Sequence, residues 1–103
     1  MSGTVEELRG EFASRLRETI DRCREVGYNP STLENMLNSG AGAVTLAKKF
    51  LLTKDPQYGL RRLAGLGRLE LSIESILLEE KFKPLFSDQD REIAKFRLEN
   101  PKL

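Results

Sequence analysis

The chain has 103 residues, a formal net charge of +1, a single cysteine and no histidine. Its length allows one domain that folds without disulfides or metal ions, and one cysteine excludes a disulfide within the chain. Histidine is the commonest general base and a frequent metal ligand, so its absence leads us to expect no catalytic residues, no metal site and no cofactor.

No stretch of the sequence has the length and apolarity of a membrane span. The longest run without a charged residue covers 35–47 and is interrupted by Asn, Ser and Gly, whereas a spanning helix needs about 20 apolar residues. The first residues, MSGTVEEL, are polar and acidic rather than the start of an apolar leader. Because the chain also lacks a pair of cysteines, we expect a domain of the reducing cytoplasm with no membrane contact.

The first predicted helix runs from Thr4 to just before Gly27. Thr4 and Glu7 have the spacing of a capping box, and Gly27 can end the helix in a left-handed conformation. Apolar residues recur at steps of three and four and form one stripe: Val5, Leu8, Phe12, Leu16, Ile20 and Cys23. This stripe predicts that Cys23 is a buried structural thiol rather than a nucleophile.

Two shorter helices are predicted next. Asn29 and Pro30 suit the cap and first turn of the second helix, which ends near Asn38. The glycine-dense segment SGAGA (39–43) then leads into a third helix that ends at Leu52. Amides at a helix start can bind anions, but no strand precedes this segment and no Gly-Lys-Ser/Thr ending follows, so we favour a junction between helices over a phosphate loop.

A fourth helix is predicted between Pro56 and Leu66. Asp55 is its cap, Pro56 its first residue, and Gly67 its stop. The segment RLEL (68–71) that follows alternates polar and apolar residues over too short a length for a strand. We expect an extended connection there, with its two leucines buried.

Two further helices complete the pattern. Ser72 is expected to cap the first of them, which Pro84 stops. Ser87 caps the last helix, with acidic residues in its first turn, and Pro101 ends it. The residues of this last helix that we expect to face inward are Ile93, Ala94 and either Phe96 or Leu98.

These elements predict an all-α fold. We expect residues 1–103 to form a single compact bundle of five to six short helices. The densest apolar segment runs from Gly59 to Phe86, so this segment and the first helix should form the centre of the core.

The charge distribution in the middle of the chain provides the best functional signal. Residues 45–68 contain only one acidic side chain, Asp55, and six basic ones: Lys48, Lys49, Lys54, Arg61, Arg62 and Arg68. The short connection 53–56 predicts antiparallel packing of the third and fourth helices, which would place basic side chains from both on one face. Such a face attracts phosphate backbones without reading base sequence. The alternative interpretation is that these side chains only decorate a solvated surface and stabilise helix C-termini.

Several short motifs after the first helix form one pattern. They are Gly27-Tyr28-Asn29-Pro30, Met36-Leu37, Gly40 and Gly42 before Ala47-Lys48, Leu66 to Ser72 with Glu74, Leu85-Phe86, Glu92-Ile93-Ala94 and Arg97-Leu98. In these residues the chain resembles a small helical module that recurs in bacterial proteins, sometimes beside domains linked to restriction or mobile-element defence. The module more often has Asp and Thr where this chain has Glu70 and Ser72, changes that keep helix capping intact. The resemblance implies an all-helical fold and a bacterial source more than any activity.

Two functions follow from this sequence. The first is a non-catalytic module that binds nucleic acid weakly through backbone contacts of the six basic residues, in a bacterial defence or mobile-element context. The alternative is a module for protein interaction or homo-oligomerisation without nucleic-acid binding. The two differ in salt dependence, because phosphate contacts weaken steeply with salt and an apolar interface does not.

Overall fold

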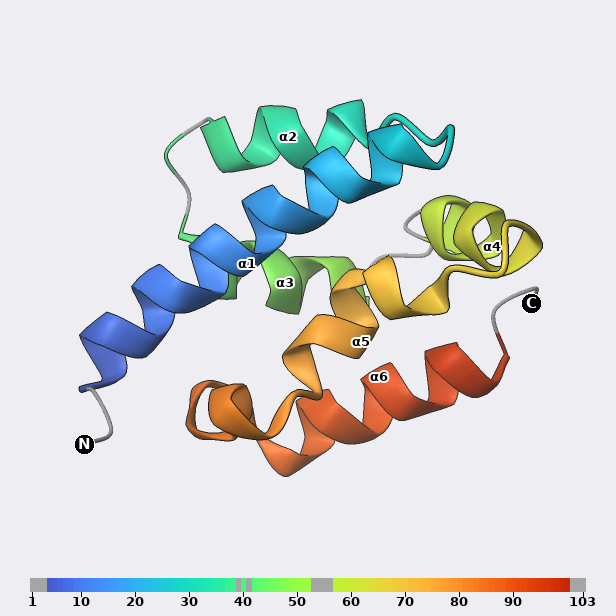
Figure 1. Cartoon of the computed structure of the whole chain (residues 1–103). Coiled ribbons are helices and arrows are strands. Elements are labelled where there is room, and N and C mark those ends of the chain that lie inside the picture. Colours follow the sequence, from blue (N-terminus) through green and yellow to red (C-terminus); the bar gives the residue numbers. More distant parts are fainter. Residues whose placement is uncertain (1–3, 39, 41, 53–56, 101–103) are drawn as a thin grey trace.

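The computed structural model of the chain describes residues 4–38, 40, 42–52 and 57–100, without the side chains of residues 32, 50 and 57–59. The elements in chain order are α1 (Val5–Glu25), α2 (Ser31–Asn38), α3 (Ala43–Leu52), α4 (Gln57–Gly65), the 3₁₀ helix η1 (Leu69–Leu71), α5 (Ile73–Leu77), the 3₁₀ helix η2 (Glu80–Leu85) and α6 (Asp88–Glu99). Every regular element in these ranges is helical, which confirms the all-α prediction (Figure 1). None of these helices is both long enough and apolar enough to cross a bilayer.

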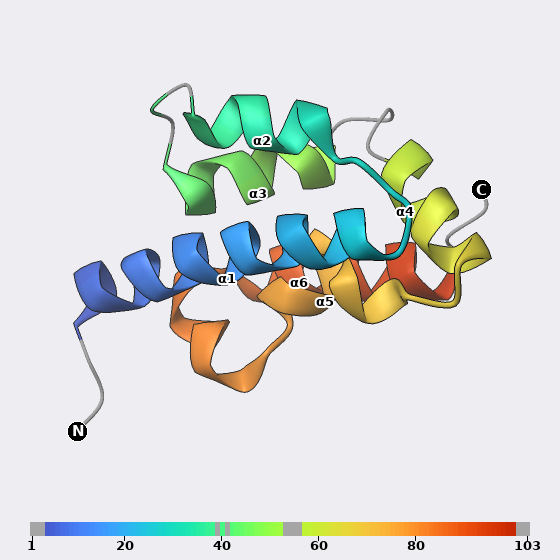
Figure 2. The same ribbon diagram turned by 45° about the horizontal axis from the view of Figure 1, so that its top comes forward.

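The long helix α1 is the central element of the bundle. It packs against α2 and α3 on one side and against η1, α5 and η2 on the other (Figure 2). α6 contacts both α3 and α5 and so closes the bundle. α4 lies at the end of the bundle beside the C-terminal end of α1, where it packs on η1 (Figure 1).

Local signals define both ends of α1, as the sequence predicts. The Thr4 hydroxyl accepts a hydrogen bond from the Glu7 amide at 3.2 Å, and the Glu7 carboxylate accepts one from the Thr4 amide at 3.1 Å. At the other end Gly27 has φ 94°, and the Tyr28 amide donates to the Cys23 carbonyl at 2.9 Å. This geometry is a Schellman motif, which satisfies carbonyls that the helix itself leaves without donors.

The main core contains the apolar stripe of α1 and apolar residues from all the later elements except α4 and η1. Its buried members from the three helices α1–α3 are Phe12, Leu16, Ile20, Leu33, Leu37, Ala43, Val44, Leu46, Ala47 and Leu51, and those from the C-terminal part are Ile73, Ile76, Leu77, Phe82, Leu85, Phe86 and Ala94. The Phe12 ring meets those of Phe82 and Phe86 edge to face, with centroids 5.1 and 5.2 Å apart, contacts worth about 0.5–1.5 kcal/mol each beyond burial. Val5, at 49% exposure, lies outside this core, although it continues the predicted stripe.

A second, smaller group of buried residues lies where α1 ends. This end cluster consists of Cys23, Leu63 and Leu71, with Val26 and Tyr28 half-buried against it. A second Schellman motif leads the chain from α4 into it, because Gly67 has φ 72° and the Arg68 amide donates to the Leu63 carbonyl at 2.8 Å. The end cluster therefore joins the C-terminal end of α1 to α4 and η1.

The prediction of an extended RLEL segment was wrong, because residues 69–71 form the 3₁₀ helix η1. The Leu71 amide donates to the Arg68 carbonyl at 3.1 Å, and the hydroxyls of Ser72 and Ser75 donate to the Leu69 carbonyl at 2.8 and 2.9 Å. These side-chain bonds satisfy the tight turn locally. Of the two leucines expected to be buried, Leu71 is buried and Leu69 is half-buried.

The predicted helix from Ser72 to Pro84 was also wrong in its length. Ser72 does cap α5 through the Ser75 amide, but α5 ends at Leu77 and Pro84 lies inside η2. Glu79 is extended, with φ −61° and ψ 139°, and redirects the chain so that η2 lies on α1. The phenylalanine contacts with Phe12 outweigh the local preference for a continued helix.

α6 begins as predicted and differs in what it buries. Ser87 and Asp90 form a capping box, and Ala94 is fully buried. Phe96 is 57% exposed, whereas Arg97 is buried and its Nε donates to Glu74 Oε2 of α5 at 2.8 Å. Both side chains of this ion pair are less than a tenth exposed. A buried ion pair therefore joins α5 to α6.

Candidate functional site

Two of the predicted basic residues lie on α3, which makes no extensive contact with α4. Lys48 and Lys49 are exposed near the end of α3, and the Lys48 ammonium lies 3.9 Å from Asp90 Oδ2 of α6. α3 packs against α1, α2 and α6, so Lys48 is directed toward α6. An ion pair this long between partly exposed side chains contributes little to stability.

α4 carries the two adjacent arginines of the predicted region. Arg61 and Arg62 are exposed, while Leu60 and Leu63 on either side of them are buried. Because Leu60 and Leu63 face inward at a helical spacing of three, Arg61 and Arg62 lie on the exposed side of the helix. The sequence of α4, QYGLRRLAG, contains no acidic residue. Because the main neighbour of α4 is η1, the expected antiparallel packing of α3 on α4 is not the arrangement found.

The other two predicted site residues have different positions. Lys54 lies outside the described residues. Arg68 follows the Gly67 turn, and its Nη1 lies 3.2 Å from Glu70 Oε2. The structure thus divides the described members of the predicted site into three locations: Lys48 and Lys49 on α3, Arg61 and Arg62 on α4, and Arg68 at the start of η1.

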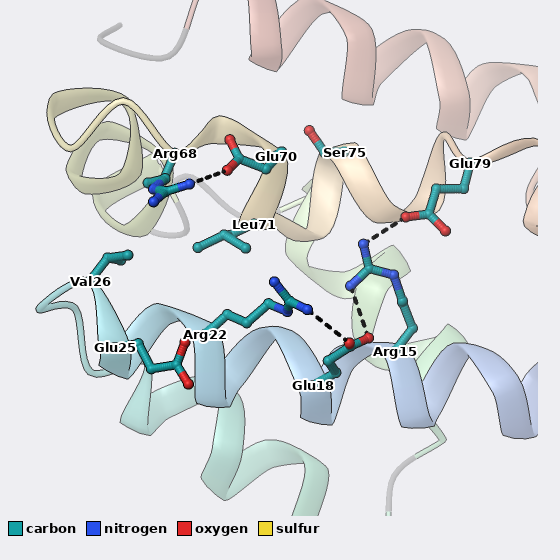
Figure 3. A pocket seen from close by; sticks show the side chains of 10 residues that line it. All are labelled: Arg15, Glu18, Arg22, Glu25, Val26, Arg68, Glu70, Leu71, Ser75 and Glu79. Atoms are coloured by element: carbon teal, nitrogen blue, oxygen red, sulfur yellow. Dashed lines mark hydrogen bonds and ion pairs between the residues drawn. The ribbon is translucent and has the colours of Figure 1, made fainter.

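A groove of about 440 Å³ lies between α1 and the segment from Arg68 to Glu79 (Figure 3). Its residues on the α1 side are Arg15, Glu18, Arg22, Glu25 and Val26, and those on the other side are Arg68, Glu70, Leu71, Ser75 and Glu79. Three guanidinium groups and four carboxylates line this groove, so its net charge is −1. We call this set of residues the mixed-charge groove.

Ion pairs connect most of the charged side chains in the mixed-charge groove. Arg15 bridges its two sides, because Nη2 lies 2.9 Å from Glu79 Oε2 and Nη1 lies 3.5 Å from Glu18 Oε1. Arg22 Nη2 lies 3.4 Å from Oε2 of the same Glu18 carboxylate. A backbone hydrogen bond and the nearby Arg68 guanidinium lower the pKa of Glu70. Since Arg68 pairs with Glu70, each of the three arginines in the groove has a carboxylate partner.

Glu25 differs from the other carboxylates of the mixed-charge groove. Among the residues that the structure describes, no basic group lies within 4 Å of it. It is exposed in the last turn of α1. A carboxylate at the C-terminal end of a helix faces the negative end of the helix dipole, so a cation from outside would be favourable there.

The sequence analysis did not predict the mixed-charge groove, although the charged residues of its α1 wall lie close together in the sequence. The charges at 15, 18, 22 and 25 alternate in sign at helical spacing, which by itself is typical of a solvated face. Within α1, Glu18 pairs with Arg22, four residues later. Glu11 instead pairs with Lys81 at 3.0 Å, and Arg15 pairs with Glu18 and with the distant Glu79. Only the fold shows that residues 68–79 form the opposite wall.

Cys23 lies in the end cluster, as the stripe predicts, and does not line the mixed-charge groove. Burial raises the pKa of its thiol, and a hydrogen bond with Thr19 lowers it by a smaller amount. Within the described ranges, no group of three or more Cys, Asp and Glu side chains is placed to hold a metal ion.

Comparison with known proteins adds no relative, since no family model, curated protein or solved structure matches this chain.

Proposed function

We propose that this chain is a non-catalytic helical module that associates with nucleic acid through the exposed arginines of α4. The observation that carries the proposal is the position of Arg61 and Arg62, which lie side by side on the outer face of a helix with no acidic residue. Neighbouring guanidinium groups on a convex helix surface can contact successive phosphates of one strand.

Other basic residues of the middle region lie on other elements. Lys48 is on α3, 3.9 Å from Asp90 of α6, and Arg68 is at the start of η1. Lys49 is exposed in the last turn of α3 and would add a more distant contact. Because phosphate contacts carry no information about base sequence, the binding is largely independent of sequence. Its dissociation constant is about 1–100 μM at physiological salt.

The test is a titration of a labelled duplex and a labelled single strand at about 50 and 200 mM salt. The variant Arg61→Glu/Arg62→Glu is expected to weaken binding at least tenfold and to reduce the salt dependence. A matched control is Lys83→Glu/Lys95→Glu, which makes the same change in net charge at exposed positions of η2 and α6. Circular dichroism checks that both variants keep their helical content.

The outcome of the control decides between a site and bulk attraction. If both double variants weaken binding equally, only the net charge matters and the α4 surface has no special role. If the unchanged protein shows no binding at low salt, the proposal fails.

The proposed context is bacterial defence or mobile elements in the cytoplasm. The support is the resemblance to the bacterial module that sometimes accompanies restriction domains, together with a free, buried Cys23 that suits a reducing compartment.

A further inference from the structure

The charges of the mixed-charge groove favour a cationic ligand over an anionic one. Each of its three arginines already has a carboxylate within 4 Å, so an anion would have to displace a carboxylate to bind. Glu25 has no such partner among the described residues, and Glu79 contacts Arg15 through Oε2. A carboxylate can accept several hydrogen bonds, so the Oε1 atom of Glu79 is available to a second donor.

The dimensions of the groove match a short extended peptide. Its α1 side reaches from Arg15 to Val26, which corresponds to about 16 Å at 1.5 Å per helical residue. An extended chain covers this length with about five residues at 3.3 Å each. Figure 3 shows Glu25 and Val26 near one end of the groove, Glu79 at the other, and Leu71 between them.

We propose that the mixed-charge groove binds an extended segment of a partner protein that has basic, apolar and basic residues at alternate positions. Alternate side chains of an extended chain point to the same side, so the first, third and fifth residues face the groove together. The two basic residues meet Glu25 and Glu79 at the two ends, and the apolar residue between them meets Leu71. Because the contacts are exposed charges around a small apolar centre, the binding is weak and decreases with salt.

This proposal does not rest on nucleic-acid binding by α4. The ligand has the opposite charge, and the residues that contact it come from α1, η1 and the α5–η2 region rather than from α4. A failure of either proposal therefore leaves the other in place.

The test is a nuclear magnetic resonance titration of the full chain, labelled with ¹⁵N, with the capped peptide Lys-Ser-Leu-Ser-Lys. Chemical-shift changes are expected at 15–26 and 68–79. The reversed-charge peptide Glu-Ser-Leu-Ser-Glu should bind at least tenfold more weakly. Two further ligands supply the cations without the apolar side chain: the peptide Lys-Ser-Gly-Ser-Lys and spermidine. Each should bind at least about threefold more weakly than the leucine peptide.

Protein variants locate the site. Glu25→Gln is expected to weaken binding of the lysine peptide about threefold and Glu25→Lys about tenfold. Glu92→Lys, on the exposed side of α6, is the matched control and should leave the affinity unchanged. The proposal is overturned if millimolar peptide causes no shift changes in the groove, if Glu25→Lys binds as well as the unchanged chain, or if spermidine binds as tightly as the leucine peptide.

Discussion

Leu63 joins α4 to the end cluster. It is 4% exposed and forms the end cluster with Cys23 and Leu71. We predict that Leu63→Ala lowers the free energy of unfolding by about 2–3 kcal/mol, the lower part of the range for buried leucines, because the cluster is small and can partly collapse. Urea unfolding monitored by circular dichroism measures this loss.

The matched control for Leu63 is Leu52→Ala in α3. Leu52 is 79% exposed, so its truncation should change the free energy of unfolding by less than about 0.5 kcal/mol. Equal losses at the two positions would contradict the assignment of Leu63 to the inside of the end cluster.

Cys23 should react slowly in the native protein. It is buried, and burial raises the pKa of its thiol, so little of the reactive thiolate is accessible at neutral pH. We predict slow modification by a thiol reagent under native conditions and fast modification in denaturant. Native labelling as fast as that of the unfolded chain would show that Cys23 is accessible.

The same raised pKa has a consequence for stability at alkaline pH. Between the unfolded and folded pKa values the folded state binds the thiol proton more often, so the free energy of unfolding decreases as the pH rises above about 8.5. Unfolding measurements across this range on the unchanged chain and on Cys23→Ala would show a smaller alkaline decrease in the variant.

The buried polar residues could not be predicted from the sequence. The Thr19 hydroxyl is buried and donates to the Leu71 carbonyl at 2.7 Å, across a separation of more than fifty residues in sequence. An apolar stripe predicts which hydrophobic residues are inside, but a threonine or arginine beside it reads as solvated surface. The partner that makes burial of Thr19 or Arg97 acceptable is known only once the fold is known.

At the scale of elements, the signals that lie within a few residues were predictable. The capping boxes at Thr4 and Ser87 and the glycine stops at Gly27 and Gly67 each involve residues no more than five positions apart. The break after α5 was not, because it depends on Phe82 reaching Phe12 on a distant helix. Short helices such as α5 and η2 are fixed by what they pack against rather than by their own propensity.

The buried pair of Glu74 with Arg97 should be the strongest single tie between α5 and α6. We predict that Arg97→Met costs about 3–5 kcal/mol, because it leaves the Glu74 carboxylate buried without its partner. The double variant Glu74→Leu/Arg97→Met should recover most of this loss, since two apolar side chains need no compensating charge. Urea unfolding of both variants measures the difference.

The control for this experiment is the same arginine-to-methionine change at an exposed pair. Arg22 and Glu18 are each more than half exposed, so Arg22→Met should cost less than about 1 kcal/mol. A cost at Arg97 as small as that at Arg22 would indicate that solvent reaches the Glu74–Arg97 pair.

At the scale of the whole molecule, the structure has a large main core and a small end cluster. Local opening needs less free energy where fewer apolar groups are buried. We predict that amide hydrogens of α4 exchange with solvent at least about tenfold faster than those in the middle of α1, which packs on both sides. Hydrogen exchange followed by nuclear magnetic resonance measures both sets in one experiment.

The exchange pattern of Leu63→Ala provides an internal check. The substitution should strongly accelerate amide exchange in α4. In α3, which packs in the main core, exchange should accelerate only by the amount that corresponds to the loss in the free energy of global unfolding. Uniform protection across α3 and α4 would mean that the two clusters open together as one unit.

The fold class followed from the sequence, whereas the candidate site followed only in part. Helical periodicity and caps predicted an all-α bundle. The sequence shows the excess of basic residues in 45–68, but the expected single face depended on α3 and α4 packing together, and α4 packs on η1 instead. The mixed-charge groove joins residues 15–26 to residues 68–79, and no local pattern indicates such a pairing.

The central position of α1 also determines how long its apolar stripe stays exposed while the chain is being synthesised. The apolar stripe of α1 packs on elements that follow it, and Phe12 reaches its ring partner Phe82 only after about seventy further residues. At a translation rate of roughly 5–20 residues per second, this stripe waits about 4–14 s for its last partners. During that interval a nascent chain presents an amphipathic helix with an uncovered apolar face, the kind of surface that chaperones at the ribosome bind.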